Sequence, residues 1–260
     1  MLRQIIRHRR TILYLAMQQV RDRYLGTMGG AIWVVLQPLL LLLVFWVVFS
    51  QGFRIQVTSG QAFILVLFCG LISWTAFSDA VSGSVNAITG RAYLIKKIAF
   101  PVEILPMTHI VAAMATHAVM LVVLVGMLAW YRVWPGPGLL LFPYYLFAMG
   151  CFAASLSVLF SAVNVFYRDV SQGLAIIINV WFWATPIVWP AEMLPSRFAP
   201  MLDFNPMYYI VTGYRNVFLT PDIVLPDLRL TVFFWALTIG LWIVGSNVFQ
   251  RLKPSFADVL

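Results

Sequence analysis

The stretch from Asn164 to Pro195, NVFYRDVSQGLAIIINVWFWATPIVWPAEMLP, decides the fold class. It begins with charges at Arg168 and Asp169, runs apolar over 174–188, and ends among prolines. Charged side chains can lie in water and an apolar run can lie in lipid, while prolines stop a helix from continuing. The stretch therefore predicts a membrane helix with its charged end at the cytoplasmic surface and a broken, gate-like end on the far side.

The composition extends this prediction to the whole chain. Of 260 residues, 62% are hydrophobic and only 10% are charged, and the mean hydropathy is +0.90. Soluble domains are nearer half apolar and a quarter charged. The apolar runs are continuous and of helix-spanning length, which favours helices over alternating strands. We therefore expect an all-α polytopic membrane protein that forms a single membrane domain over residues 1–260.

The apolar runs predict six transmembrane helices of about 20 residues each. An N-terminal amphipathic interface helix precedes them, and short re-entrant gate helices precede the last span. The expected spans are residues 31–50, 62–82, 104–130, 139–163, the run at 174–188, and 228–249. The expected gate region is 190–227, which is rich in proline and aromatic residues and needs protein or a water-filled cavity around it.

Two basic segments lie outside the spans. Residues 1–28 carry apolar residues at helical spacing with most arginines off that stripe, which predicts a helix on an anionic leaflet; a basic topogenic tail is the alternative. Residues 86–101 place Arg91, Lys96 and Lys97 among apolar side chains. So many apolar residues favour docking into a partner's groove over a solvated loop.

The charge distribution predicts the orientation. The net charge is +8, and twelve of the 17 Lys and Arg residues lie at the termini or in loops on the same side of six spans. The positive-inside rule then places both termini in the cytoplasm, and no nucleic-acid partner is needed to explain the charge. Cys69 and Cys151 fall in apolar runs and are expected to be buried small side chains.

The sequence lacks the motifs that would supply energy or catalysis. It contains no G-x-x-x-x-G-K-[ST] loop and no H-E-x-x-H. His109 and His117 stand eight residues apart on roughly one helix face, a spacing that by itself is a weak signal for a metal or proton site. Asp79 is the one acidic residue well inside a span, whereas ion-coupled carriers usually need several such groups. An energy source outside this chain is therefore expected.

The remaining candidate for a functional feature is a cluster of aromatic residues. Trp181, Phe182 and Trp183 cover nearly a full helical turn, so at least one of them should face the interior of the bundle. An aromatic face can pack against the C–H face of a sugar ring. A channel for a hydrated, uncharged polymer is one interpretation of this cluster, and lipid-facing or core packing is the other.

Several runs resemble the membrane subunit of type-2 ABC exporters for cell-surface polysaccharide, the Wzm-like O-antigen, capsule and teichoic-acid permeases. The runs lie in the family's order over most of the chain. They are Arg23-Tyr24, Thr27, Gly30, Trp33 and Pro38 in the first-span motif, with Gly29 where leucine is usual; 94–97, 100–101 and 105–106 in the coupling segment; 164–169 in the N-x-F-[FY]-R-D loop; and 185–188, 194–195 and 205–208 in the gate.

The resemblance implies a homodimer in a bacterial cytoplasmic membrane that carries two copies of a separate ATPase subunit, which binds ATP and Mg²⁺. This chain would hold no cofactor or metal and would have no catalytic residue, and lipid-linked polysaccharide would pass through it. The implied sites are ATPase coupling at Arg91, Tyr93, Lys96, Lys97, Phe100, Arg168 and Asp169; a channel at Trp33, Gln37, Phe45, Trp181, Phe182 and Trp183; a lipid head-group site at Arg21 and Arg23; and an outer gate at Trp189, Met193, Tyr208 and Tyr209.

Two alternatives to the exporter of polysaccharide stay open at this point. A type-2 ABC permease for a drug or a lipid would share the architecture but need less aromatic surface at the gate. A membrane-embedded glycan enzyme would need an acid–base constellation on one face, and the sequence contains none that we can identify.

Overall fold

A computed structural model describes residues 1–24, 30, 32–54, 62–93 and 100–260, with only the backbone of residues 2, 23 and 24. All regular structure in these residues is helical, and no strand occurs among them, which confirms the all-α prediction for this part of the chain. The α-helices are α1 (Leu2–Arg7), α2 (Arg9–Tyr24), α3 (Ile32–Trp46), α4 (Phe63–Val85), α6 (Leu105–Trp130), α7 (Phe142–Phe166), α8 (Asp169–Ala184), α9 (Ala199–Asp203), α10 (Pro206–Leu219), α11 (Leu228–Leu252) and α12 (Phe256–Val259).

Five helical stretches of the described chain are long and apolar enough to cross a membrane. They include short π- and 3₁₀-helical extensions, such as the π-helical turn Val47–Gly52 that continues α3. Their ranges agree with five of the six expected spans: Ile32–Gly52, Phe63–Val85, Val102–Trp130, Pro137–Phe166 and Leu228–Val259.

The fifth expected span, the apolar run at 174–188, forms a shorter helix than predicted. Helix α8 has 16 residues and ends at Ala184, although the apolar run continues to Val188. Thr185 leaves the helix with φ −99° and ψ 132°. The cause is Pro186, because a proline ring disfavours helical dihedral angles at the residue before it. Helix α8 is therefore shorter than the length of about 20 residues that a bilayer requires.

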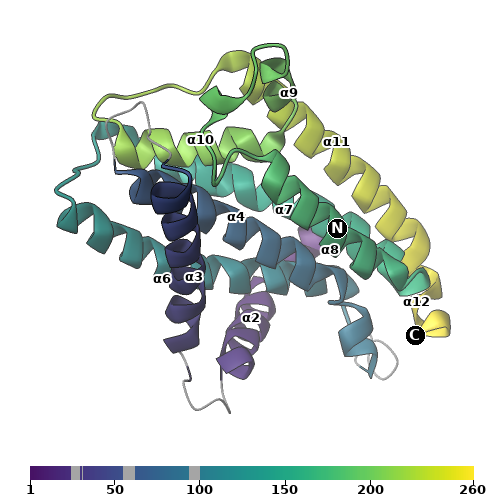
Figure 1. The fold of residues 1–260 in the computed structure, drawn as a ribbon. Helices are drawn as coiled ribbons and strands as arrows, with labels where there is room; N and C mark the ends of the chain where they lie inside the picture. Colours follow the sequence, from purple (N-terminus) through teal and green to yellow (C-terminus); the bar gives the residue numbers. More distant parts are fainter. Residues whose placement is uncertain (25–29, 31, 55–61, 94–99) are drawn as a thin grey trace.

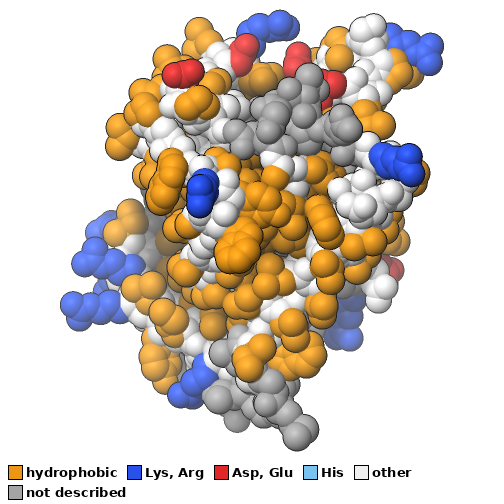
Figure 2. Space-filling model, turned by 60° about the vertical axis from the view of Figure 1, so that its left-hand side comes forward, with side chains coloured by type: hydrophobic (Ala, Val, Ile, Leu, Met, Phe, Trp, Pro, Cys, Tyr) orange, Lys and Arg blue, Asp and Glu red, His pale blue; other side chains and the backbone are white. Residues whose placement is uncertain are grey.

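Helix α4 lies at the centre of the bundle, against α6, α7 and α10, while α11 packs along α7 (Figure 1). The ring of Phe77 in α4 stacks on Phe152 of α7 with centroids 5.5 Å apart. Helix α3 is peripheral, and only Val34 and Leu42 of its side chains are buried. Figure 2 shows hydrophobic side chains over most of the middle of one face, with Lys and Arg mainly toward its edges, as a lipid-embedded surface requires.

The N-terminal segment docks on the bundle through one side of α2. Ile12 and Ala16 are buried against α6, whereas the apolar side chains of Leu13 and Met17 are exposed. The helix therefore has one apolar face on protein and a second one left for lipid or another partner. Gly30 has a left-handed φ of 47° where the chain turns toward α3, a conformation that glycine adopts without strain.

Residues 190–227 contain two α-helices, α9 and α10, and a 3₁₀ turn at Ala191–Met193. Pro206 occupies the first turn of α10, where a missing N–H costs nothing, and the Asn205 side chain caps this helix by accepting from the amides of Met207 and Tyr208. Helix α10 is the longer of the two and packs on α4 and α7, and the re-entrant arrangement of short gate helices stays a prediction.

Candidate functional site

The three consecutive aromatic residues of α8 divide between two environments. Trp181 packs edge-on against Trp74, Phe77 and Phe152, with ring centroids 5.4–6.0 Å apart. Its indole Nε1 donates to Asn205 Oδ1 at 2.8 Å. Trp181 is therefore a packing residue that joins α8 to the core of this chain.

Phe182 and Trp183 lie against α3, and Phe182 also meets the edge of Trp74 in α4 with centroids 5.7 Å apart. Phe45 stacks on Phe182 with centroids 5.7 Å apart and meets the edge of Trp183 at 6.1 Å. Trp183 is 50% exposed. The sequence prediction named all three α8 aromatics together with Phe45, and the structure brings Phe45, Phe182 and Trp183 into one cluster.

Trp33 and Gln37 lie further along α3 at an open cavity of about 780 Å³ between α3, α4 and α6. Asp79 of α4 and Thr116 of α6 form part of its wall. Both Trp33 and Gln37 are exposed in the single chain. Apart from Trp181, the predicted channel residues thus fall into an aromatic cluster at one end of α3 and a cavity with a carboxylate at the other.

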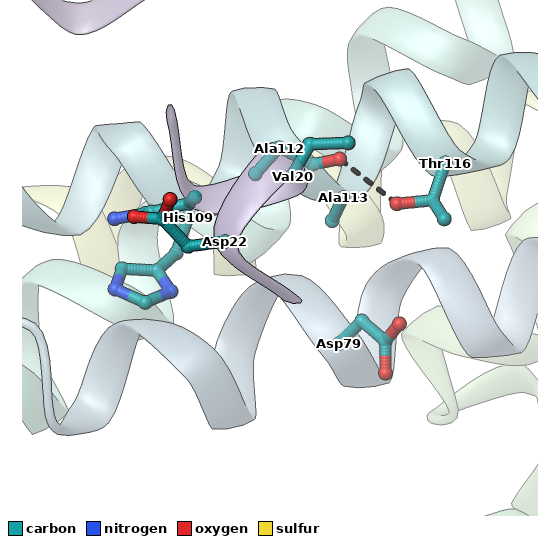
Figure 3. A pocket seen from close by; sticks show the side chains of 8 residues that line it. Val20, Asp22, Asp79, His109, Ala112, Ala113 and Thr116 are labelled. Atoms are coloured by element: carbon teal, nitrogen blue, oxygen red, sulfur yellow. Dashed lines mark hydrogen bonds between the residues drawn. The ribbon is translucent and has the colours of Figure 1, made fainter. Parts of the chain in front are cut away.

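A second pocket of about 260 Å³ adjoins this cavity and shares Asp79 and Thr116 with it. Figure 3 shows Asp22 of α2 lying beside His109 of α6 in this pocket, with Asp79 on α4 below them. Gln19 Nε2 donates to Thr108 Oγ1 at 2.9 Å, which holds α2 on α6. Arg21 is exposed at this end of α2, and the side chain of Arg23 lies outside the described residues.

The two histidines do not share a site. His117 Nε2 lies 3.0 Å from the hydroxyl of Tyr214 in the buried core, whereas His109 lines the pocket of Figure 3. Within the described ranges, no three His, Cys, Asp or Glu side chains gather as metal ligands would. Cys69 is buried, as expected, and Cys151 is half-buried.

Asn205, in the predicted gate region, connects two helices. Asn205 Nδ2 donates to Thr185 Oγ1 at 2.9 Å, and its Oδ1 accepts from Trp181 while it caps α10. The end of α8 and the start of α10 are therefore held together by one amide. Sequence analysis assigned Asn205 to a gate motif without a role, and only its position between the two helices gives it one.

Trp189, Met193, Tyr208 and Tyr209 have different surroundings. Trp189 Nε1 donates to the carbonyl of Trp183 at 3.0 Å, and Met193 is 62% exposed. Tyr209 is buried, and its hydroxyl lies 2.7 Å from that of Tyr144 and 3.0 Å from Thr231 Oγ1. Tyr208 is half-buried and lines a cavity with Trp189. Tyr209 therefore anchors α10 to α7 and α11, while the other three remain accessible.

At the opposite end of the bundle, the predicted coupling residues belong to two segments that a contact at Asn164 joins. Asn164 Nδ2 donates to the Val85 carbonyl at 3.2 Å and to Asn86 Oδ1 at 3.0 Å, which ties the end of α7 to the end of α4. This contact brings the 164–169 loop and the segment after α4 together. Of the predicted residues, Tyr93, Arg168 and Asp169 are exposed, Arg91 and Phe100 are half-buried, and Lys96 and Lys97 lie outside the described residues.

An ion pair with one buried partner supports this end of the chain and was missed by sequence analysis. Lys253 Nζ lies 2.6 Å from Glu103 Oε1, with side-chain exposures of 37% and 4%. Glu103 precedes α6 by two residues and Lys253 follows α11, so the pair joins segments 150 residues apart. The ion pair therefore ties the start of α6 to the end of the last span.

Replacing Lys253 with methionine is expected to lower the free energy of unfolding by about 2 kcal/mol. Breaking a buried pair usually costs about 3–5 kcal/mol because a charge is left without compensation, and the partial exposure of Lys253 reduces this. Thermal denaturation in nanodiscs measures the change. Adding Glu103→Gln to Lys253→Met should recover part of the loss. A double variant no more stable than the single one would contradict the expectation.

The sequence pattern described as ABC-2 type transporter matches residues 10–219. The chain belongs to the ABC-2 type transporter family. It is 28% identical over 260 residues to a Myxococcus xanthus protein named O-antigen export system permease protein RfbA, covering 99% of this chain and 98% of that one. Two Klebsiella pneumoniae proteins of the same name are 26% and 25% identical, each over 96% of this chain and 94% of the relative.

The family resemblance seen in the sequence is thus confirmed. As an ABC-2 transporter membrane component, the chain has no catalytic domain of its own. Besides Asn205 and Glu103, Arg215 is a residue of this ABC-2 chain to which sequence analysis gave no role. Arg215 is half-buried and donates from Nε to the Val66 carbonyl at 3.2 Å and from Nη2 to the Ile187 carbonyl at 2.9 Å.

Proposed function

We propose that this chain is the permease of an ATP-driven exporter that moves lipid-linked polysaccharide, of the O-antigen class, across a bacterial cytoplasmic membrane. The observation that carries the proposal is the end-to-end similarity to permeases named for O-antigen export, over 99% of this chain. The aromatic cluster at Phe45, Phe182 and Trp183, in which Trp183 is exposed, supports it, because such rings suit a sugar polymer. A drug or lipid permease is the alternative, since the same architecture would serve it.

The channel is proposed to form between two copies of the chain. Helices α3 and α8 leave apolar side chains uncovered in the single chain, including Leu40, Val44, Ile177 and Val180. A homodimer that pairs these helices would enclose Trp33, Gln37, Phe45, Phe182 and Trp183 around a central path. In this arrangement Trp181 stays behind the channel wall and supports it.

Six crossings, with both termini in the cytoplasm, complete the proposed topology. Helix α8 spans about 24 Å at 1.5 Å per residue, which is less than the hydrocarbon core of about 30 Å. The non-helical residues 185–190 would cover the remaining depth. Their surroundings support this, because Thr185, Pro186, Ile187 and Val188 are all buried in protein, as irregular backbone at membrane depth must be. Residues 190–227, with Trp189, Met193, Tyr208 and Tyr209, would form the outer gate.

The surface built by Arg91, Tyr93, Phe100, Arg168 and Asp169, with the segment that contains Lys96 and Lys97, is proposed to dock the ATPase subunit. Two copies of that subunit would bind ATP and Mg²⁺, and this chain would need no cofactor. The Asn164–Asn86 contact supports the proposal, because it joins both parts of the surface to the same helices, α4 and α7. Movement of the docked subunit would therefore reach the centre of the bundle.

Arg21 and Arg23 are proposed to meet the lipid pyrophosphate at the cytoplasmic surface. The pocket beside α2 carries the carboxylates of Asp22 and Asp79, which would repel a phosphate. The head group would accordingly contact the exposed side of α2, where Arg21 lies with Leu13 and Met17, rather than enter that pocket.

The proposed function is tested by locating lipid-linked glycan in cells that lack this chain. We expect the glycan to accumulate on the cytoplasmic side and surface glycan to disappear, with both restored by the wild-type gene. Extraction of the accumulated lipid would then identify the substrate. Unchanged surface glycan in the deletion strain would instead favour the drug or lipid permease and make the aromatic cluster a packing feature.

A further inference from the structure

Arg215 forms part of the wall of a cavity of about 310 Å³ between the start of α4, the segment 187–192 and one face of α10. This volume lies at the lower end of the range typical of small-ligand sites. The side chains of the cavity that can recognise a ligand are Trp189, Glu192, Tyr208, Thr212, Arg215 and Asn216. None of them is used by the coupling surface or by the cluster between α3 and α8.

The guanidinium group of Arg215 is held in place before any ligand arrives. Its bonds to the carbonyls of Val66 and Ile187 use two of its five N–H groups. The backbone of α4 and of the broken segment after α8 therefore fixes the orientation of the group. The remaining N–H groups are donors for a ligand in the cavity, so the site is preorganised.

The charge of the cavity favours a neutral ligand. Arg215 and Glu192 are the two charged side chains of its described lining, and their charges are opposite. A phosphate or a uronate would be attracted by the positive charge of Arg215 and repelled by the negative charge of Glu192. A neutral molecule with hydroxyl groups can form hydrogen bonds with both side chains, as donor to the carboxylate and as acceptor from the guanidinium. Asn216 adds an amide with both capacities, and Thr212 adds a hydroxyl group.

Two aromatic rings of the cavity lining could also contact a sugar. Tyr208 and Trp189 both line the cavity, and an aromatic face with its negative quadrupole attracts the polarised C–H groups of a pyranose ring. Trp189 also lines a neighbouring cavity of about 620 Å³ that contains Trp183 and Phe204. Trp189 thus stands between the aromatic cluster of α8 and the polar cavity at Arg215.

We propose that the cavity at Arg215 is a second glycan site, which binds one neutral pyranose unit of the polymer after it has passed Trp183 and Trp189. This inference rests on the proposed export of polysaccharide. Binding at this position would hold the emerging chain and oppose its return while the ATPase resets. Sugar units with a negative charge would bind more weakly here because of Glu192.

The test uses the full chain in nanodiscs and saturation-transfer NMR with defined probes at millimolar concentrations. The probes are methyl α-mannopyranoside and methyl α-glucopyranoside as neutral sugars, with galacturonate and inorganic phosphate as anions. We expect transfer to a neutral glycoside and about tenfold weaker binding in Tyr208→Leu and in Glu192→Gln, because each removes one principal contact. Asp203→Asn, on α9 and outside the cavity lining, is the matched control and should bind as the wild type does.

Arg215 itself is left unchanged in this test, because its two carbonyl bonds also join α10 to α4 and a substitution would disturb packing. The proposal is overturned if no neutral glycoside binds, if both variants bind them as the wild type does, or if the anions bind more tightly to the wild type than the neutral sugars.

Export assays separate this inference from the function on which it rests. Loss of surface glycan in the deletion strain, together with slower export in Tyr208→Leu and Glu192→Gln at normal protein amounts, is the expected result. Loss in the deletion strain with wild-type export rates in both variants would overturn the second glycan site alone. Unchanged surface glycan in the deletion strain would overturn the proposed function, whatever the cavity binds.

Discussion

Exchanging Lys96 and Lys97 together for glutamate is expected to abolish ATP-driven export while leaving the protein folded. The two lysines lie in the basic, apolar segment 86–101, which we propose docks into a groove of the ATPase subunit. Reversing both charges opposes that contact, since like charges brought together at an interface cost several kcal/mol. Surface glycan in cells and co-purification of the ATPase subunit are the two measurements.

The matched control reverses two charges at the opposite end of the molecule, Arg132→Glu with Arg229→Glu. Both arginines are exposed and lie outside the proposed coupling surface. This variant should keep its ATPase subunit and continue to export. Normal surface glycan in the Lys96 and Lys97 variant would remove the docking role from this segment.

Trp181→Ala and Trp183→Ala are expected to fail for different reasons, although the residues are two positions apart. Trp181 packs against Trp74, Phe77 and Phe152 and donates to Asn205, so its removal leaves a cavity and takes away one hydrogen bond to the Asn205 amide. We expect Trp181→Ala to lower the free energy of unfolding by about 3 kcal/mol. Reduced amounts of folded protein, rather than a slower transport cycle, should account for its loss of export.

Trp183→Ala should lower the free energy of unfolding by about 1 kcal/mol, less than Trp181→Ala, because Trp183 is 50% exposed and loses aromatic contacts with Phe45 and Phe182. Its export at equal protein amounts should fall several-fold, since an aromatic surface of the proposed channel is lost. Thermal denaturation in nanodiscs and export per folded molecule distinguish the two variants. Equal losses of stability and export in both would show that Trp183 also acts through packing.

Much of the architecture could be predicted from hydropathy alone. Residues that must avoid water form long apolar runs, so the ranges of α4, α6, α7 and α11 agree with expected spans to within a few residues. The helix boundary at Ala184 was predicted less well, because the apolar run masks the local effect of Pro186 on the residue before it.

The residue types of the candidate site could be predicted, but not the directions in which their side chains point. Hydropathy places Trp181 and Trp183 in the same helix, but one ring packs into the core and the other points away. The same limit applies to α2, whose buried face carries Ile12 and Ala16 rather than Leu13 and Met17. Which face of a helix is buried depends on the neighbours that pack against it, and in a membrane protein lipid and protein present similar apolar surroundings.

By itself, the sequence determined the fold class, the ABC-2 family and the absence of a phosphate-binding loop, because these depend on composition and on local order along the chain. The tertiary structure alone decided that Asn205 joins α8 to α10, that Lys253 pairs with Glu103, and that Arg215 faces a cavity beside Glu192. Each of these contacts joins residues distant in sequence. A buried polar side chain must form a hydrogen bond, and which partner is within reach depends on how the helices pack.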